Sequence, residues 1–193
     1  MSKRLYLDGC SYTYGLGLDH NDTLAGRWES QYEIINKTRP GKSNLAMALD
    51  TFENIQSCDI IVIGWTFSSR SYLKYHGHDI DLLPSRTVVD LPFERDTKVM
   101  SDIYTDLHRN FYALHDTAFA NHYSDFLVCS IKAMCEKYQK TTVFFSWERR
   151  KVDANIYYPT ISRQMRLPDG HLNVDGTTHL YNNLQQLIYE QGR

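Results

Sequence analysis

The sequence predicts an α/β fold, a three-layer α/β/α sandwich in which a mainly parallel sheet lies between two layers of helices. Continuous apolar runs at Ile60 to Ile63 and Val143 to Phe145 are typical of strands covered on both faces. Apolar residues at helical spacing lie between and after these runs. Strands and helices therefore alternate along the chain, as a layered α/β fold requires.

Four strands and two long helices are expected. The strands are Arg4 to Asp8, Tyr32 to Asn36, Asp59 to Gly64 and Thr141 to Ser146. Apolar residues at i, i+4 and i+7 spacing mark the helices, with Leu127, Ile131, Met134 and Tyr138 in one and Leu180, Leu184 and Leu187 in the other.

One stretch interrupts this alternation, from Ser71 to about Ser101. It is polar and charged, contains Pro84 and Pro92, and shows no sustained period. We expect a long loop excursion over residues 71–101 that leaves the carboxyl end of a strand, where open α/β sheets bind ligands.

Composition narrows the protein class. A length of 193 residues with 42% hydrophobic residues predicts a single domain, 1–193. The net charge of -2 and a pI near 6.4 argue against nucleic-acid binding. Without a signal-like segment or a run approaching ~18 apolar residues, we expect no membrane association and a cytoplasmic location. The four cysteines show no CxxC pairing and are expected to be reduced thiols: Cys10, Cys58, Cys129 and Cys135.

Two segments at opposite ends carry groups suited to catalysis. The first, Gly9-Cys10-Ser11-Tyr12-Thr13-Tyr14-Gly15, follows a predicted strand, and its small residues permit a sharp turn that exposes the Ser11 hydroxyl. The second, Asp169-Gly170-His171, supplies a carboxylate and an imidazole. A parallel sheet could bring these groups together at one edge, which is the inventory of a serine hydrolase. Each segment alone is also compatible with an ordinary turn.

The first segment resembles the Gly-Asp-Ser-x-Thr-x-Gly block of the SGNH hydrolases, also called GDSL-like lipases and acylhydrolases, with Cys10 at the Asp position. The segment from His171 to Gly176 is similar to the closing His-Pro-Asn-x-x-Gly block, with Leu172 in place of Pro. The resemblance implies an SGNH hydrolase or flavodoxin-like fold, with Ser11 as nucleophile, His171 as base and Asp169 as its orienting carboxylate. Many family members place the Asp three residues ahead of the His, whereas here the separation is two. A Ser-His dyad aided by a backbone carbonyl therefore stays open.

Two middle blocks extend the resemblance. Gly41 follows the second predicted strand, where SGNH proteins carry a glycine of the oxyanion hole. Gly64-Trp65-Thr66-Phe67 is similar to the family's Gly-x-Asn-Asp block, with Thr66 at the Asn position. The resemblance implies an oxyanion hole formed by the backbone N–H groups of Ser11 and Gly41, with Thr66 or Asn44 as the side-chain donor.

The expected substrate is a short acyl ester, either a small molecule or an O-acetylated carbohydrate, cleaved through an acyl-enzyme intermediate without a cofactor. Tyr12, Tyr14 and Trp65 could form a platform for a sugar ring or an aryl acyl group. Two alternatives stay open. The same site could serve an acyltransferase, or the chain could be an SGNH-like binding or assembly protein that has lost its activity.

Histidines suggest a metal site as another alternative. His76-Gly77-His78-Asp79 places two imidazoles and a carboxylate close together, and another three histidines repeat every seven residues, at His108, His115 and His122. Neither group forms a complete ligand set, so we expect no metal.

Overall fold

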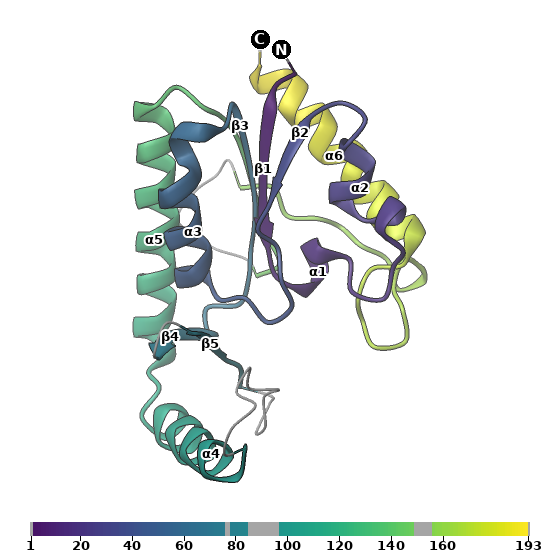
Figure 1. Ribbon diagram of the computed structural model, residues 1–193. Coiled ribbons are helices and arrows are strands. Elements are labelled where there is room, and N and C mark those ends of the chain that lie inside the picture. The colour runs from purple at the N-terminus through teal and green to yellow at the C-terminus, as the bar shows by residue number, and fades with distance from the viewer. Residues whose placement is uncertain (1, 76–77, 85–96, 149–155, 193) are drawn as a thin grey trace.

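A computed structural model describes residues 2–75, 78–84, 97–148 and 156–192. Its centre is a parallel sheet of order β2-β1-β3-β6 (Figure 1), made of β1 (Arg4–Gly9), β2 (Glu33–Asn36), β3 (Ile60–Trp65) and β6 (Thr141–Ser146). All four predicted strands are confirmed, and each end lies within about one residue of its predicted position.

Helices cover both faces of this sheet, which confirms the three-layer prediction (Figure 1). One face carries α3 (Asn44–Asn54) and α5 (Thr117–Lys137). The other carries the short α1 (Ser11–Tyr14), α2 (Leu24–Trp28) and α6 (Val174–Gln191). Both helices that were expected from apolar spacing are present, as α5 and α6, and Tyr138 forms the C-cap of α5.

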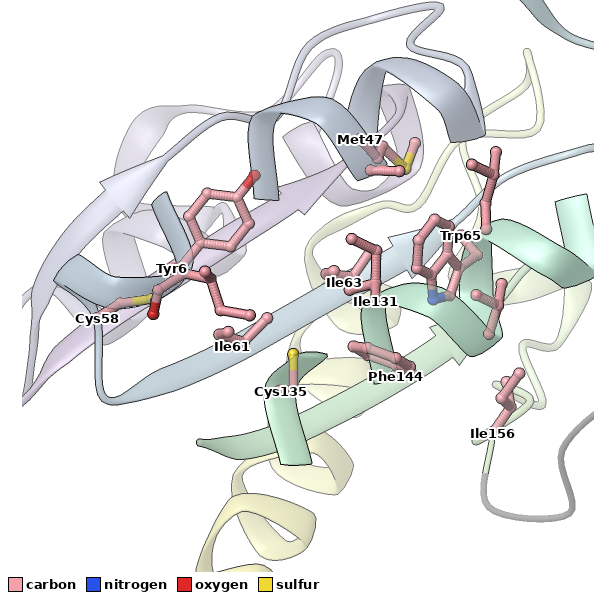
Figure 2. Close-up of a cluster of buried hydrophobic side chains, with 14 of the residues drawn as sticks. Tyr6, Met47, Cys58, Ile61, Ile63, Trp65, Ile131, Cys135, Phe144 and Ile156 are labelled. Atoms are coloured by element: carbon pink, nitrogen blue, oxygen red, sulfur yellow. The ribbon is translucent and has the colours of Figure 1, made fainter. Parts of the chain in front are cut away.

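Side chains alternate between the two faces along each strand, as the pleat of a strand requires. Tyr6, Ile61, Ile63 and Phe144 lie in the core beneath α3 and α5, where Met47 and Ile131 meet them (Figure 2). The intervening residues pack against α2 and α6 in a second core, which includes Leu5, Leu7, Val62, Val143, Leu180 and Leu184. The continuous apolar runs are thus explained by burial on both faces.

The winding of the sheet reverses between β1 and β3. The chain passes from β1 to β2 on one side, then returns through α3 to β3 on the other side of β1. In open α/β sheets, ligands bind at the carboxyl ends of the strands where the winding reverses in this way. Gly9 at the end of β1 pairs with Gly64 in β3, so the segments that follow both strands start at the same level.

The expected loop excursion over residues 71–101 is wrong in part. It contains an antiparallel hairpin of β4 (Ser71–Tyr75) and β5 (His78–Leu82), and α4 (Thr97–Ala113) begins within it. Ile80 and Leu82 are buried with Phe111 and Tyr112 of α4 packed against them. Contacts with a later helix therefore stabilise strands too short to show a sustained period. Residues 76–77 and 85–96 lie outside the described part.

Within the described residues, no helix is long and apolar enough to cross a bilayer. All four cysteines are free thiols.

Candidate active site

Ser11 is the first residue of α1 and follows β1 after a sharp turn. Gly9 ends β1 with a φ of 157°, and Gly15 ends α1 in the left-handed conformation, with a φ of 80°. A Cβ atom on Gly9 or on Gly64 would lie 2.2 or 2.4 Å from the Thr13 hydroxyl oxygen, so Thr13 occupies the space above both glycines. The turn is thereby packed onto the ends of β1 and β3, and it leaves Ser11 only 6% exposed.

His171 comes from a tight turn just before α6. The N–H of Leu167 donates to the His171 carbonyl at 2.7 Å, and Gly170 adopts a φ of 90° within the turn. Arg166 pairs with Leu172 in an antiparallel bridge, and its Nη1 donates to the Gly170 carbonyl at 2.7 Å. These bonds fix the backbone that carries the imidazole.

Asp169 reaches His171 despite the two-residue spacing. Its Oδ1 accepts the backbone N–H of His171 at 3.1 Å, and its Oδ2 lies 3.0 Å from Nδ1 of the ring. The ring N–H is not aligned for a hydrogen bond, so the second contact is an electrostatic one. The backbone N–H of His171, followed by its side chain, lowers the pKa of Asp169 below its ordinary value. The Asp169 side chain is 59% exposed and that of His171 18%.

Tyr12 connects the two predicted catalytic segments. Its ring centroid lies 4.9 Å from that of His171 and 4.9 Å from that of Trp147. The Arg166 guanidinium lies over the Tyr12 ring at 5.9 Å. Because Tyr12 directly follows Ser11, these contacts place the imidazole beside α1, although the two segments lie at opposite ends of the sequence.

Sequence reasoning missed Trp147 and Arg166. Trp147 lies directly after β6, at the same edge of the sheet as the residues that follow β1 and β3. Its position after a predicted strand was a usable signal, whereas Arg166 lies in irregular chain and had none.

Thr66 follows β3 and is fully buried. Asn44 holds its backbone from both sides: Oδ1 accepts the Thr66 N–H at 2.9 Å, and Nδ2 donates to the Thr66 carbonyl at 3.1 Å. Nδ2 also donates to the Ser124 hydroxyl at 3.2 Å. Both amide hydrogens of Asn44 are thus already donated, so Asn44 positions the Thr66 segment in this structure.

Gly41 lies in the loop between β2 and α3, with a φ of 79°. The next residue, Lys42, is fully buried and anchors this loop to β1. Its Nζ donates to both carboxylate oxygens of Asp8, at 2.6 and 2.8 Å, and to the Lys37 carbonyl at 2.8 Å. Asp50 of α3 lies 2.5 Å from the same nitrogen. The segment with the predicted oxyanion glycine is therefore fastened beside the segment with Ser11.

Asp8 is the centre of this buried cluster, and sequence reasoning missed it. It accepts the Tyr6 hydroxyl and the Gly9 N–H, both at 2.7 Å. Burial raises the pKa of Asp8 to about 6, with Lys42 and these hydrogen bonds acting in the opposite direction. Burial also raises the pKa of Tyr6 far above its ordinary value, so Tyr6 stays neutral. The usable signal was a charged residue at the end of an apolar run.

The aromatic platform is corrected at one position. Trp65 has no exposed surface. Its ring packs edge-on against the Phe144 ring, with 5.7 Å between the ring centroids (Figure 2). Alternate residues of β3 face the core beneath α3 and α5, and Trp65 belongs to that set. It is a core residue, so the expectation that it contacts substrate is wrong. Tyr12 is partly buried, and Tyr14 is 43% exposed.

The three histidines that repeat every seven residues lie in three different environments. Nε2 of His108 lies 2.6 Å from the Leu83 carbonyl, His115 faces a cavity beside α5, and His122 is exposed. Among the described residues, no three His, Cys, Asp or Glu side chains are placed to hold a metal ion. His76 and Gly77 lie outside the described part.

No family model and no curated protein matches this sequence. Solved structures match its fold. The esterase EstA from a Pseudoalteromonas species superimposes with a TM-score of 0.54 and 9% identity over 98% of each chain. The chain therefore shares the α/β fold of this esterase. TesA is similar at a TM-score of 0.47 and 12% identity, over 98% of this chain and 99% of that one. A GDSL-like lipase from Bacteroides thetaiotaomicron is similar at a TM-score of 0.41 and 14% identity, over 97% of this chain and 88% of that one. At these identities the likeness establishes the fold, and it is the match to EstA that carries this conclusion.

Proposed function

We propose that the protein is a serine ester hydrolase with Ser11 as nucleophile, His171 as general base and Asp169 as the carboxylate that orients His171. One observation carries the proposal. The His171 imidazole packs against Tyr12, the residue after Ser11, while Asp169 lies 3.0 Å from its Nδ1. The match to EstA, an esterase of the same fold, supports ester hydrolysis as the reaction class.

In this proposal the two ring nitrogens of His171 have different roles. Nδ1 faces the carboxylate, so Nε2 is the nitrogen that accepts a proton. In the first step the Ser11 oxygen attacks the ester carbonyl while its proton passes to Nε2. Collapse of the tetrahedral intermediate breaks the bond to the alcohol, which takes that proton as it leaves. Water then repeats the sequence on the acyl-enzyme and releases the acid.

The oxyanion would be stabilised by the backbone N–H groups of Ser11 and Gly41 together with the Thr66 hydroxyl. Support comes from the anchoring of all three segments at one edge of the sheet. Lys42 fastens the Gly41 loop to β1, and Asn44 fastens Thr66 to α3. Asn44 itself acts as a positioning residue in this scheme because both its amide hydrogens are already donated.

The proposed substrate is a short acyl ester, and an O-acetylated carbohydrate is the first class to test. Exposed or half-buried aromatic rings beside the site, from Tyr12, Tyr14 and Trp147, are suited to packing against a sugar ring or an aryl acyl group. Arg166 adds a positive charge over Tyr12, which would favour substrates with polar or anionic alcohol parts.

The deciding experiment is reaction with a fluorophosphonate probe, followed by intact mass. A fluorophosphonate labels a serine only when a nearby base activates it. We expect one adduct on the wild type and on Ser57→Ala, which alters an exposed serine just before β3, and none on Ser11→Ala. Wild type and Ser57→Ala should hydrolyse an aryl acetate at similar rates, whereas Ser11→Ala should lose several orders of magnitude in turnover. Equal turnover of wild type and Ser11→Ala would favour a binding protein with this fold.

A further inference from the structure

A cavity of about 440 Å³ lies beside β4 between residues of α4 and α5, elements that lie at the lower left of Figure 1. Its walls come from the start of α3, the segment 68–71, the end of α4 and the first half of α5. Most of the lining is apolar: Leu45, Leu107, Phe111, Leu114, Phe119 and Leu127. None of the described residues that line it is Ser11, Asp169 or His171. Its volume falls within the range of small-molecule sites.

Two polar nitrogens are buried at this cavity without a partner. Nη1 of Arg70 and Nε2 of His115 make no hydrogen bond to any residue that the structure describes. The Arg70 guanidinium lies over the Phe67 ring, 5.5 Å from its centroid, and this contact supplies no hydrogen-bond acceptor. Arg70 as a whole is half-buried, but its Nη1 is buried without an acceptor, so an anion bound here would give this N–H group the hydrogen bond that it lacks.

Several other polar groups of the cavity already have hydrogen-bond partners. The Ser68 hydroxyl contacts Asn121 Oδ1 at 2.5 Å, and both amide hydrogens of Asn44 are donated. Asp116 is the single carboxylate among the described lining residues, and its Oδ1 accepts the Phe119 N–H at 2.8 Å as the N-cap of α5. Arg70 is the one cationic side chain of fixed charge among the described lining residues, and its Nη1 is buried without an acceptor, so we expect it to recognise the charged end of a ligand, with His115 as a second polar contact.

We propose that this cavity binds a monocarboxylate with an aliphatic tail. The carboxylate pairs with Arg70, whose guanidinium suits the two oxygens of a carboxylate. The tail lies against the leucine and phenylalanine side chains of α4 and α5. A small number of polar groups that fix one end of a ligand, within a mainly apolar lining, is the usual composition of such sites. Ser11, Asp169 and His171 do not line the cavity, so binding there does not depend on ester hydrolysis.

Calorimetric titration of the full chain with octanoate tests this site, with octan-1-ol as the uncharged ligand of similar length. Wild type should bind octanoate more tightly than octanol. Arg70→Met should weaken octanoate binding by about 10- to 100-fold, because a hydrogen bond to a charged group is lost, and should leave octanol binding unchanged. Arg70→Lys should restore part of the affinity. The matched control is Arg109→Met, which removes an exposed arginine of α4 outside the cavity and should change nothing.

The same titration on Ser11→Ala separates this site from the catalytic one. We expect octanoate to bind Ser11→Ala as it binds wild type, because Ser11 does not line the cavity. Loss of binding in that variant would place the acid at the catalytic serine and overturn the proposal. Equal octanoate affinities in wild type and Arg70→Met, with both proteins folded by circular dichroism, would also overturn it, as would an absence of octanoate binding to wild type.

Discussion

Lys42 and Asp8 form a fully buried ion pair beneath the turn that carries Ser11, with Lys42 Nζ 2.6 and 2.8 Å from the two carboxylate oxygens. The pair joins the β2–α3 loop to the end of β1. It also joins the two segments from which the backbone donors of the proposed oxyanion hole come, Ser11 and Gly41. Loss of one partner would leave the other as an uncompensated buried charge.

Lys42→Met should lower the free energy of unfolding by about 3 to 5 kcal/mol, because it leaves Asp8 buried without its cation. Lys37→Met is the matched control, since Lys37 is exposed and contributes its backbone carbonyl to the cluster. Lys37→Met should alter the free energy of unfolding by no more than about 0.5 kcal/mol. Urea unfolding followed by circular dichroism measures both. Similar losses in the two variants would contradict a structural role for the ion pair.

The stability of the protein should depend on pH through Asp8. Burial raises the pKa of Asp8 from 3.8 to about 6 on folding, so the folded protein binds this proton more tightly than the unfolded chain does. The contribution of Asp8 to the free energy of unfolding is therefore largest below about pH 4 and falls as the pH rises to about 6. Asp8→Asn should remove this pH-dependent decrease in the free energy of unfolding, whatever its effect on overall stability. Asp106→Asn, at an exposed position, should keep it.

Asp169→Asn should preserve the fold, since the asparagine oxygen can still accept the His171 N–H. Turnover of an aryl acetate should drop by at least about 10-fold, because an amide favours the wrong imidazole tautomer. We expect less than the roughly 10⁴-fold loss known for a buried triad aspartate, since Asp169 is largely exposed. Unchanged kcat would show that a backbone carbonyl orients His171 instead.

Tyr12 should act through its ring. Tyr12→Leu removes the aromatic contacts with His171 and Trp147 and should lower kcat by up to about 10-fold, the value of one good aromatic pair. Tyr12→Phe keeps the ring and should retain most of the activity. Steady-state kinetics separate this effect from substrate binding. A variant in which KM alone rises would identify Tyr12 as a substrate contact with no influence on His171.

Thr66→Val tests the proposed side-chain donor at nearly constant volume. Loss of a hydroxyl that stabilises the oxyanion should cost roughly 100-fold or more in turnover. Thr142→Val makes the same change in β6 at the opposite edge of the sheet, where the hydroxyl donates to the Lys140 carbonyl, and should leave turnover unchanged. If both variants retain full activity, the backbone N–H groups of Ser11 and Gly41 are sufficient for the oxyanion.

The strands and the positions of the candidate residues after them could be read from the sequence. Apolar runs such as Ile60 to Ile63 report burial on both faces, which is a local property of the chain. The segments that follow these strands must then meet at the carboxyl edge of a parallel sheet. For this reason the sequence alone assigns Ser11 and Thr66 to one edge.

Tertiary structure decided which way each side chain points and what it meets. Strand register turns Trp65 into the core, and the fold alone brings Lys42 to Asp8 and the His171 ring to Tyr12. The cavity at Arg70 likewise depends on how α4 packs against α5 and the hairpin. These contacts join residues far apart in the chain, so no local pattern records them. Their formation depends on how the packed layers bring distant segments together, and periodicity carries no information about that.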